Sequence, residues 1–419
     1  MKIGKPFGRT IKPKSSKLYE ERIAIAGKLP VEEPSLSPFG SLAGFVVCLV
    51  AAGAFCISTD HVAVGIGLIV FGLLPAIVAV VQANSLVNAA LDGKMKFFSA
   101  PTETDSFGPK AAELFRQANK ALSKAELDEA EKNREAEVEA TKAWFEAAQP
   151  EFDIVDITAS DGIRLVGHSL VANPDSNSWL VMAHGLGGGW KSCLGVAHHF
   201  AEKGFNLLLV EMRAQGESGG KVMGAGHLER RDLIDWCQWL IAEKTPAAAG
   251  EAAEKAPELS IVLMGQSLGA AAAIEACGEA DLPTQVKCVV SDSAFADFWN
   301  EAIFVMGSMG LNGKAVAPHP ILDLVRVMFR SRKGGYDFAD ASAVKAIAHA
   351  QAPVLLQHGE DDQLVPPFNV ERLDEAAGGA AAGENHEKVR IPSAGHCCAA
   401  GAAPEAYYGA VFSFIERHL

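Results

Sequence analysis

The sequence predicts an α/β protein, with a mostly parallel sheet covered by helices on both faces and a separate pair of apolar helices before it. Two patterns indicate this. Two long uncharged segments lie near the N-terminus, and from about residue 150 short apolar segments alternate with amphipathic ones. Such alternation is typical of parallel sheets, because consecutive parallel strands need a crossover connection that is usually a helix. A chain of 419 residues is long enough for both parts.

Composition narrows the class of protein. The formal net charge is −14, so the chain as a whole is a poor partner for nucleic acid. The eight cysteines are scattered and show no C-x-x-C pair or histidine partner at the spacing of a zinc site. We therefore expect reduced thiols in a cytoplasmic setting, with neither a metal nor a cofactor.

The two apolar segments are residues 41–58 (SLAGFVVCLVAAGAFCIS) and 62–82 (VAVGIGLIVFGLLPAIVAVVQ). Each is close to the ~20 residues that cross a hydrocarbon core of about 30 Å. We expect a transmembrane helical hairpin with a tight turn at residues 58–61. A cleaved signal peptide fits poorly, because the first run starts far from Met1 and a second run follows. A buried pair of soluble helices is the remaining alternative.

Basic residues predict the orientation of this hairpin. Cytoplasmic flanks of membrane spans are rich in lysine and arginine. The turn has none, Lys94 and Lys96 follow the second span, and the leader holds Lys2, Lys5, Arg9, Lys12, Lys14, Lys17, Arg22 and Lys28. Both ends, and with them the following domain, are thus expected in the cytoplasm. The expected divisions are a basic leader (1–40), two transmembrane helices (41–84), a linker and juxtamembrane helix (85–149) and a catalytic domain (150–419).

The last of these divisions contains the expected sheet. Residues 152–158 and 163–171 flank the turn Ser160-Asp161-Gly162, which indicates a β-hairpin. The expected sheet is eight-stranded, and its other strands are residues 179–183, 206–210, 259–264, 286–291, 352–357 and 387–392. Ligand sites of open sheets of this type lie at the carboxyl ends of the strands.

One of these strands leads into a G-x-S-x-G sequence, Gly265-Gln266-Ser267-Leu268-Gly269, and then into an alanine-rich helix. Glycines two before and two after the serine remove side chains that would collide in a sharp strand-to-helix turn. The turn presents the serine hydroxyl at the edge of the sheet. We therefore predict that Ser267 is a nucleophile, the alternative being a plain helix N-cap serine.

A serine nucleophile needs a base, and the base needs an orienting acid. In a site of this kind the chain order is serine, acid, histidine. Asp362 follows the strand at 352–357 and is the predicted acid, with the adjacent Asp361 as an alternative. His396 follows the last strand and precedes the last helix, where the base is expected.

The transition state also needs hydrogen-bond donors for the oxyanion. The backbone N–H of Leu268, which follows the nucleophile, is one predicted donor. The loop His184-Gly185-Leu186-Gly187-Gly188-Gly189 offers the second, the N–H of Leu186. The same loop superficially resembles a phosphate-binding loop, but Trp190 stands where the glycine of either nucleotide motif is required. Nucleotide binding is therefore not expected.

Taken together, these motifs resemble the α/β-hydrolase superfamily. The resemblance is closest to bacterial hydrolases of the serine-aminopeptidase-like and prolyl-oligopeptidase-like type, some of them membrane-anchored at the N-terminus. It covers about residues 150–419, and its carrying sequences are HGLGGG, EMRAQGESGG, GHLERRDLIDW, GQSLG, GYDFADASA, HGEDDQLVP and AGH. One departure is Glu211, where the family usually has aspartate.

The resemblance implies a Ser267–Asp362–His396 triad, an oxyanion hole at Leu186 and Leu268, and a helical lid at about 295–345. The expected activity is a serine hydrolase, esterase- or lipase-like or aminopeptidase-like, acting on a small molecule or short peptide with an apolar part. The fold does not fix the substrate, because it serves esterases, lipases, thioesterases and peptidases alike. The alternative from another class is a catalytically silent membrane scaffold.

Overall fold

The computed structural model describes residues 37–58, 61–91, 113, 115–116, 119, 122–244, 258–307, 321–330, 336–379 and 385–419. The expected basic leader and the linker at 99–109 therefore lie outside the described residues, as do parts of the expected lid. The described cysteines, which are all eight of the chain, carry free thiols.

An eight-stranded sheet forms the centre of the molecule, with the strand order β1-β2-β4-β3-β5-β6-β7-β8. Strand β2 alone runs opposite to the other seven, so its pairs with β1 and β4 are antiparallel. All pairs from β4 to β8 are parallel. The mostly parallel sheet and the β1–β2 hairpin expected from the sequence are thus confirmed. The strands are β1 (Asp153–Thr158), β2 (Arg164–Leu170), β3 (Ser178–Ala183), β4 (Asn206–Val210), β5 (Ser260–Gln266), β6 (Val286–Asp292), β7 (Val354–Gly359) and β8 (His386–Ile391).

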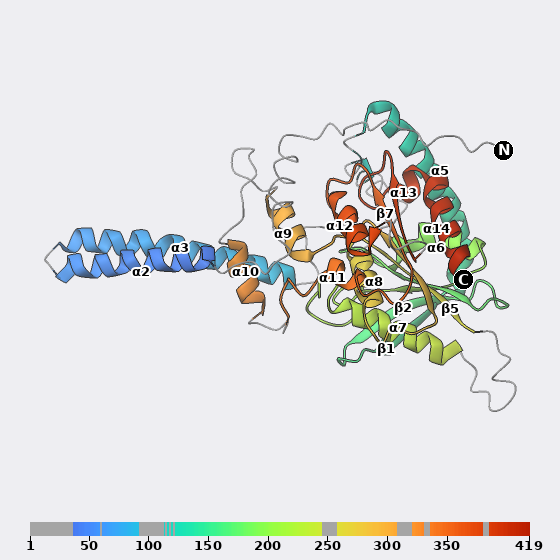
Figure 1. The fold of residues 1–419 in the computed structure, drawn as a ribbon, viewed down its shortest axis with the longest axis horizontal. Coiled ribbons are helices and arrows are strands. Elements are labelled where there is room, and N and C mark those ends of the chain that lie inside the picture. Colours follow the sequence, from blue (N-terminus) through green and yellow to red (C-terminus); the bar gives the residue numbers. More distant parts are fainter. Residues whose placement is uncertain are drawn as a thin grey trace.

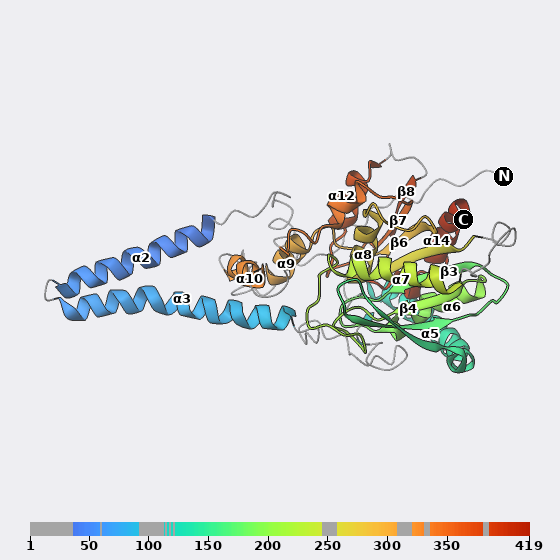
Figure 2. The same ribbon diagram turned by 90° about the horizontal axis from the view of Figure 1, so that it is seen from below.

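Helices cover both faces of this sheet (Figures 1 and 2). One face carries α7 (Glu229–Lys244), α8 (Leu268–Cys277), α11 (Ala343–Ile347) and α12 (Phe368–Ala376). The other carries α5 (Lys124–Ala148), α6 (Leu194–Glu202), α13 (Ala399–Ala402) and α14 (Pro404–His418). Two short 3₁₀ helices, η2 (Gln149–Glu151) and η3 (Trp190–Cys193), lie in the connections before β1 and α6.

Alternate residues of each strand divide between two cores. In β3, Val181 packs in the core beneath α7 and α8, whereas Leu180 and Met182 pack in the core beneath α6 and α14. This follows from the two-residue period of a strand, whose side chains point alternately to opposite faces. Since both faces are covered, the central strands are apolar throughout, which is why they are recognisable in the sequence as short continuous apolar runs.

Two helices lie between the sheet and the N-terminal pair of apolar helices (Figures 1 and 2). They are α9 (Phe298–Gly307) and α10 (Ile321–Phe329), within the segment expected to form a lid. A small separate cluster joins them to the following residues, and its buried members are Trp299, Ile303, Leu324, Val325, Phe329, Tyr336 and Phe338. The side chains of this segment therefore form a cluster of their own, against which Val222 and Leu228 also pack.

The N-terminal apolar segments form a helical hairpin, α2 (Ser37–Ser58) and α3 (Val62–Leu91), which projects away from the sheet (Figures 1 and 2). Helix α10 packs against this hairpin, mainly against α3. Within the described ranges, no helix combines the length and the apolar character needed to cross a bilayer. The structure thus confirms a helical pair here but does not support the two membrane spans expected at 41–58 and 62–82.

Candidate active site

Ser267 occupies the sharp turn between β5 and α8, as the G-x-S-x-G sequence predicts. Its backbone has φ 54° and ψ −114°, a conformation that a residue with a side chain rarely adopts. The flanking glycines are both required by close backbone contacts. A Cβ at Gly265 would lie 2.1 Å from the carbonyl oxygen of Gly269, and a Cβ at Gly269 would lie 2.4 Å from that of Ala183. The turn is therefore shaped by close packing of backbone from β5, α8 and the end of β3.

The structure brings Ser267, His396 and Asp362 together across the carboxyl edge of the sheet. The Ser267 Oγ lies 2.9 Å from Nε2 of His396, and Nδ1 of His396 lies 2.7 Å from Oδ2 of Asp362. Both distances are those of hydrogen bonds. The serine hydroxyl can donate to Nε2 only if the proton of the neutral ring is on Nδ1, where Asp362 accepts it. This is the arrangement in which an imidazole removes a proton from a serine hydroxyl.

Asp362 is fully buried and held by backbone N–H groups. Its Oδ1 accepts hydrogen bonds of 2.9 Å from the N–H groups of Leu364 and Val365. On the other side, Nε2 of His358 donates to the carbonyl of Val365 at 2.8 Å and lies 3.3 Å from Oδ2 of Asp362. The carboxylate is therefore fixed in orientation before any substrate binds.

The surroundings shift the pKa values of Asp362 and His396 in opposite directions. Burial raises the pKa of Asp362, but the positive charge of His396 and the hydrogen bond from His358 outweigh it, and the pKa stands below its usual value. Burial lowers the pKa of His396, but the charge of Asp362 more than compensates, and the pKa stands well above its usual value. Asp361, in contrast, has its pKa raised by burial, and its N–H donates to the carbonyl of Ala394. The geometry therefore favours Asp362 over Asp361 as the partner of His396.

The glycine-rich loop after β3 passes beside the nucleophile. A Cβ at Gly185 would lie 3.2 Å from Cβ of Ser267. The buried His184 fixes this loop, because its Nδ1 donates to the Gly185 carbonyl at 2.7 Å and its Nε2 accepts the Met212 N–H at 3.2 Å. Burial lowers the pKa of His184, which keeps the ring neutral and able to accept that bond.

Of the two predicted oxyanion donors, the N–H of Leu186 lies in the loop after β3 and the N–H of Leu268 lies at the start of α8. Among the described residues, no acceptor takes the N–H of Leu186 or of Leu268. Both groups are thus available to a ligand, and their use as oxyanion donors stays a prediction.

Sequence reasoning missed two side chains that hold the loop of His396. The N–H of Gly395 donates to Oδ1 of Asn119 at 2.7 Å, and the N–H of Cys397 donates to Oγ of Ser293 at 3.3 Å. Asn119 stands alone in a stretch rich in alanine, glutamate and lysine, so no local signal marks it. Ser293 directly follows β6 at the carboxyl edge, a position that could have drawn attention to it.

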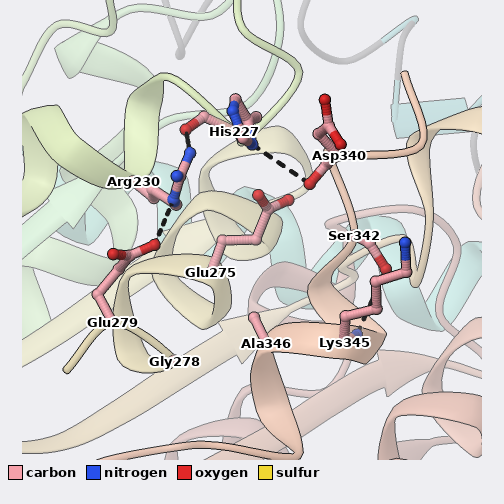
Figure 3. A pocket seen from close by; sticks show the side chains of 9 residues that line it. All are labelled: His227, Arg230, Glu275, Gly278, Glu279, Asp340, Ser342, Lys345 and Ala346. Atoms are coloured by element: carbon pink, nitrogen blue, oxygen red, sulfur yellow. Dashed lines mark hydrogen bonds and ion pairs between the residues drawn. The ribbon is translucent and has the colours of Figure 1, made fainter. Parts of the chain in front are cut away.

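A separate pocket of about 280 Å³ lies further along α8, away from the three residues above. Its lining comes from α8, the start of α7 and the residues around α11 (Figure 3). Glu275 points into it, and burial raises the pKa of this carboxyl well above its usual value. In the part of the chain that the structure describes, no group of three or more histidine, cysteine or acidic side chains is placed to hold a metal ion.

Comparison with known proteins places the chain in a family. A sequence model of the X-Pro dipeptidyl-peptidase (S15) family matches residues 116–366. The chain is 27% identical over 226 residues to the uncharacterized protein YqkD of Bacillus subtilis, a match that covers 54% of this chain and 68% of that one. It is 26% identical over 223 residues to the uncharacterized protein YfhR of Escherichia coli, covering 52% of this chain and 66% of that one.

The chain is also similar to two solved structures from Pyrococcus species. The Pyrococcus furiosus esterase Pf2001 has a TM-score of 0.48 at 23% identity, covering 65% of this chain and 95% of the esterase. The Pyrococcus horikoshii acylaminoacyl peptidase has a TM-score of 0.46 at 16% identity, covering 67% of this chain and 43% of the peptidase. The family model matches more than half of the 419 residues. The chain therefore belongs to the X-Pro dipeptidyl-peptidase (S15) family and is a serine hydrolase of the α/β-hydrolase superfamily.

Proposed function

We propose that this enzyme hydrolyses an ester, thioester or amide bond of a substrate with an apolar acyl group, through an acyl-enzyme on Ser267. The observation that carries the proposal is the continuous chain of hydrogen bonds from Ser267 through His396 to Asp362, at 2.9 and 2.7 Å. A serine that is hydrogen-bonded in this way can lose its proton to the histidine as it attacks, whereas an isolated surface serine has no base to take the proton.

The mechanism assigns one task to each group. Oγ of Ser267 attacks the substrate carbonyl carbon while Nε2 of His396 takes the hydroxyl proton. Asp362 accepts the hydrogen bond from Nδ1 and stabilises the imidazolium that forms. The N–H groups of Leu186 and Leu268 bind the oxyanion of the tetrahedral intermediate. His396 then gives its proton to the leaving group, and a water molecule, deprotonated by the same nitrogen, releases the acyl group.

An apolar acyl group is supported by the side chains between β6 and β7. Trp299, Ile303 and Phe329 belong to an apolar cluster in the segment expected to be a lid. Binding sites for small molecules are lined mainly by apolar and aromatic side chains, and such a segment near the carboxyl edge suits a substrate of that kind. The second candidate is a serine peptidase for short peptides, and the match to the S15 family favours it.

A fluorophosphonate probe and a Ser267→Ala variant test the proposed chemistry. The wild-type protein should be labelled and should hydrolyse p-nitrophenyl esters, whereas the variant should do neither and should unfold at a similar temperature. Loss of a triad nucleophile leaves only the weak catalysis of substrate binding and the oxyanion hole. A variant that keeps more than a few per cent of the rate would show that another residue is the nucleophile. An unlabelled wild-type protein would favour the silent scaffold. A panel of acyl esters, acyl thioesters and short peptides separates the two candidate substrates.

We also infer that residues 41–82 attach the enzyme to a membrane, with the catalytic domain in the cytoplasm. This rests on the uncharged sequence of the two segments and on the apolar side chains that their helices expose, such as Val47, Phe55 and Phe71, at 65%, 69% and 66%. Large contiguous apolar patches on a protein surface mark contact surfaces for a membrane or another protein.

Fractionation and protease access test this attachment on the full-length protein. It should sediment with membranes and resist extraction by carbonate. Protease added from outside should cut the catalytic domain in inverted vesicles and leave it intact in spheroplasts. Cleavage in intact spheroplasts would reverse the orientation, and a full-length protein that stays in the supernatant would rule out the attachment.

A further inference from the structure

We propose that Asn119 is a positioning residue for His396, so that the segment before the catalytic domain is part of the support of the active site. The inference rests on the proposed function, because it assigns His396 as the base. It adds that a side chain far upstream in the sequence, between the apolar hairpin and α5, fixes the loop that carries this base.

The N–H groups on either side of His396 are each held by a side chain from outside the loop. The N–H of Gly395 donates to Oδ1 of Asn119, and the N–H of Cys397 donates to Oγ of Ser293. The bond to Asn119 is the shorter, at 2.7 Å against 3.3 Å. Since these two amides flank His396 directly, they determine the direction in which its ring leaves the backbone.

Asn119 is itself held firmly. Its side chain is fully buried, and its Nδ2 donates to the carbonyl of Phe115 at 2.8 Å. That bond fixes which amide atom is the oxygen, and it leaves Oδ1 to face Gly395. Phe115 is anchored in turn, because its ring is buried in the core that includes Ala399 and Tyr407. The amide therefore has one orientation, set by a residue packed in the core of the catalytic domain.

A buried N–H that loses its acceptor must find another or remain unpaired, and either outcome disturbs the backbone around it. The ring of His396 must meet both Oγ of Ser267 and Oδ2 of Asp362 at hydrogen-bond distance. A displacement of about 1 Å in such a group can reduce turnover by about 100-fold. Loss of the Asn119 bond is thus expected to slow the chemical step more than substrate binding.

The same upstream segment supplies a matched control. Asn133 lies in α5, and its Nδ2 donates to the carbonyl of Ala402 at 2.9 Å, so this bond also joins an upstream residue to the C-terminal part of the chain. Mutation of Asn133 removes a similar long-range hydrogen bond, but the acceptor of this bond lies six residues beyond His396. A purely stabilising role for both asparagines would make the two variants alike.

The experiment compares Asn119→Ala, Asn119→Asp and Asn133→Ala in the full-length protein in detergent. Rates on a p-nitrophenyl ester are divided by the concentration of sites titrated with fluorophosphonate, which corrects for unfolded protein. Asn119→Ala should lower kcat by tenfold or more, to about the 100-fold limit, with KM within about twofold. Asn133→Ala should keep kcat within about twofold, as for substitutions away from the site.

Asn119→Asp gives a readout that simple destabilisation would not produce. A protonated aspartic acid has the shape of asparagine and can donate to Phe115 while accepting from Gly395. An ionised one can only accept, and it faces the Phe115 carbonyl. The ratio of variant to wild-type kcat should therefore be close to one at acidic pH and should fall as the pH rises. Because this variant can fold where alanine does not, it keeps the inference testable.

Three outcomes would contradict the inference. Wild-type kcat in Asn119→Ala would do so, as would equal losses in Asn119→Ala and Asn133→Ala, or a variant-to-wild-type ratio for Asn119→Asp that is independent of pH. In each case the wild-type enzyme remains active and the proposed function stands. A wild-type protein that neither reacts with fluorophosphonate nor hydrolyses any substrate would instead overturn the proposed function and this inference with it.

Discussion

The nucleophile and the base of this site are held in place by different means. Ser267 stands in a turn whose shape is set by backbone contacts between Gly265, Gly269 and the end of β3. His396 stands in a loop whose two flanking N–H groups are held by the side chains of Asn119 and Ser293. The nucleophile is thus positioned by close packing of backbone segments within the sheet, and the base by side chains more than 100 positions away in the sequence.

The sheet explains this difference. Ser267 follows β5, which pairs with β3 on one side and β6 on the other. His396 follows β8, an edge strand that pairs with β7 alone. A loop at the end of a central strand is confined by neighbours on both sides, whereas a loop at the edge has fewer backbone partners. The edge loop therefore needs side chains from other parts of the chain to give it one conformation.

The largest expected effect on turnover comes from mutating the acid, Asp362. It follows β7, which lies in the sheet between β6 and the edge strand β8. Asp362→Asn should lower turnover by about 10⁴-fold, because the imidazole loses the partner that fixes its tautomer and stabilises its charge. Asp361→Asn should change turnover by no more than about twofold, since His396 hydrogen-bonds Asp362. Steady-state kinetics on a p-nitrophenyl ester measure both. Equal losses would mean that the loop as a whole, and not the carboxylate of Asp362, orients the base.

The next effect breaks the nucleophile turn directly. Gly269→Ala places a methyl group 2.4 Å from the carbonyl oxygen of Ala183 and 2.7 Å from that of His184, and these backbone atoms leave no room for it. We expect loss of stability of about 3 kcal/mol or more and loss of turnover, as for overpacked buried positions. Gly409→Ala is the control, because a Cβ there meets nothing within 4 Å in α14.

Thermal unfolding and active-site titration distinguish the two glycine variants. Gly409→Ala should be neutral or slightly stabilising, by up to about 1 kcal/mol, since alanine favours helix. A Gly269→Ala protein with normal stability and titratable Ser267 would show that the turn can relax, and the contrast with the histidine loop would then fail.

The same contrast decides what the sequence could predict. The strand-to-helix turn at Ser267 is a local pattern, and so are Asp362 and His396 after their strands, and the structure brings these three predicted residues to hydrogen-bond distance. The central strands were recognisable because both faces are buried. Asn119 and Ser293 could not be identified, because their role depends on which distant backbone N–H they meet. The membrane spans were expected from the length and apolar character of two segments. These properties do not indicate what surrounds the helices in the folded protein.

A smaller effect is a displacement of the pH profile. His396 must be neutral to accept the serine proton, and Asp362 raises its pKa well above 6.5. Protonation therefore removes activity as the pH falls through that raised pKa, and kcat/KM should reach half its maximum at a pH above 6.5. In Asp362→Asn the raising charge is gone, so the midpoint of the residual activity should move to lower pH. A midpoint that stays in place would mean that Asp362 does not set the charge of the base.

The smallest effect is expected from the second support of the histidine loop. Ser293 accepts the N–H of Cys397 at 3.3 Å, a longer and weaker bond than that of Asn119, and removing it should lower kcat by about three- to tenfold. Ser293 also has φ 61°, which glycine adopts without strain and alanine does not. Ser293→Gly and Ser293→Ala therefore separate the hydroxyl from the backbone conformation: equal losses identify the hydrogen bonds of the hydroxyl, from the Cys397 N–H and to Oδ1 of Asp292, as the cause. Neither change removes a charge, so the pH midpoint should stay at its wild-type value. If Ser293→Gly keeps the wild-type kcat while Ser293→Ala does not, backbone conformation rather than the bond to Cys397 holds this side of the loop.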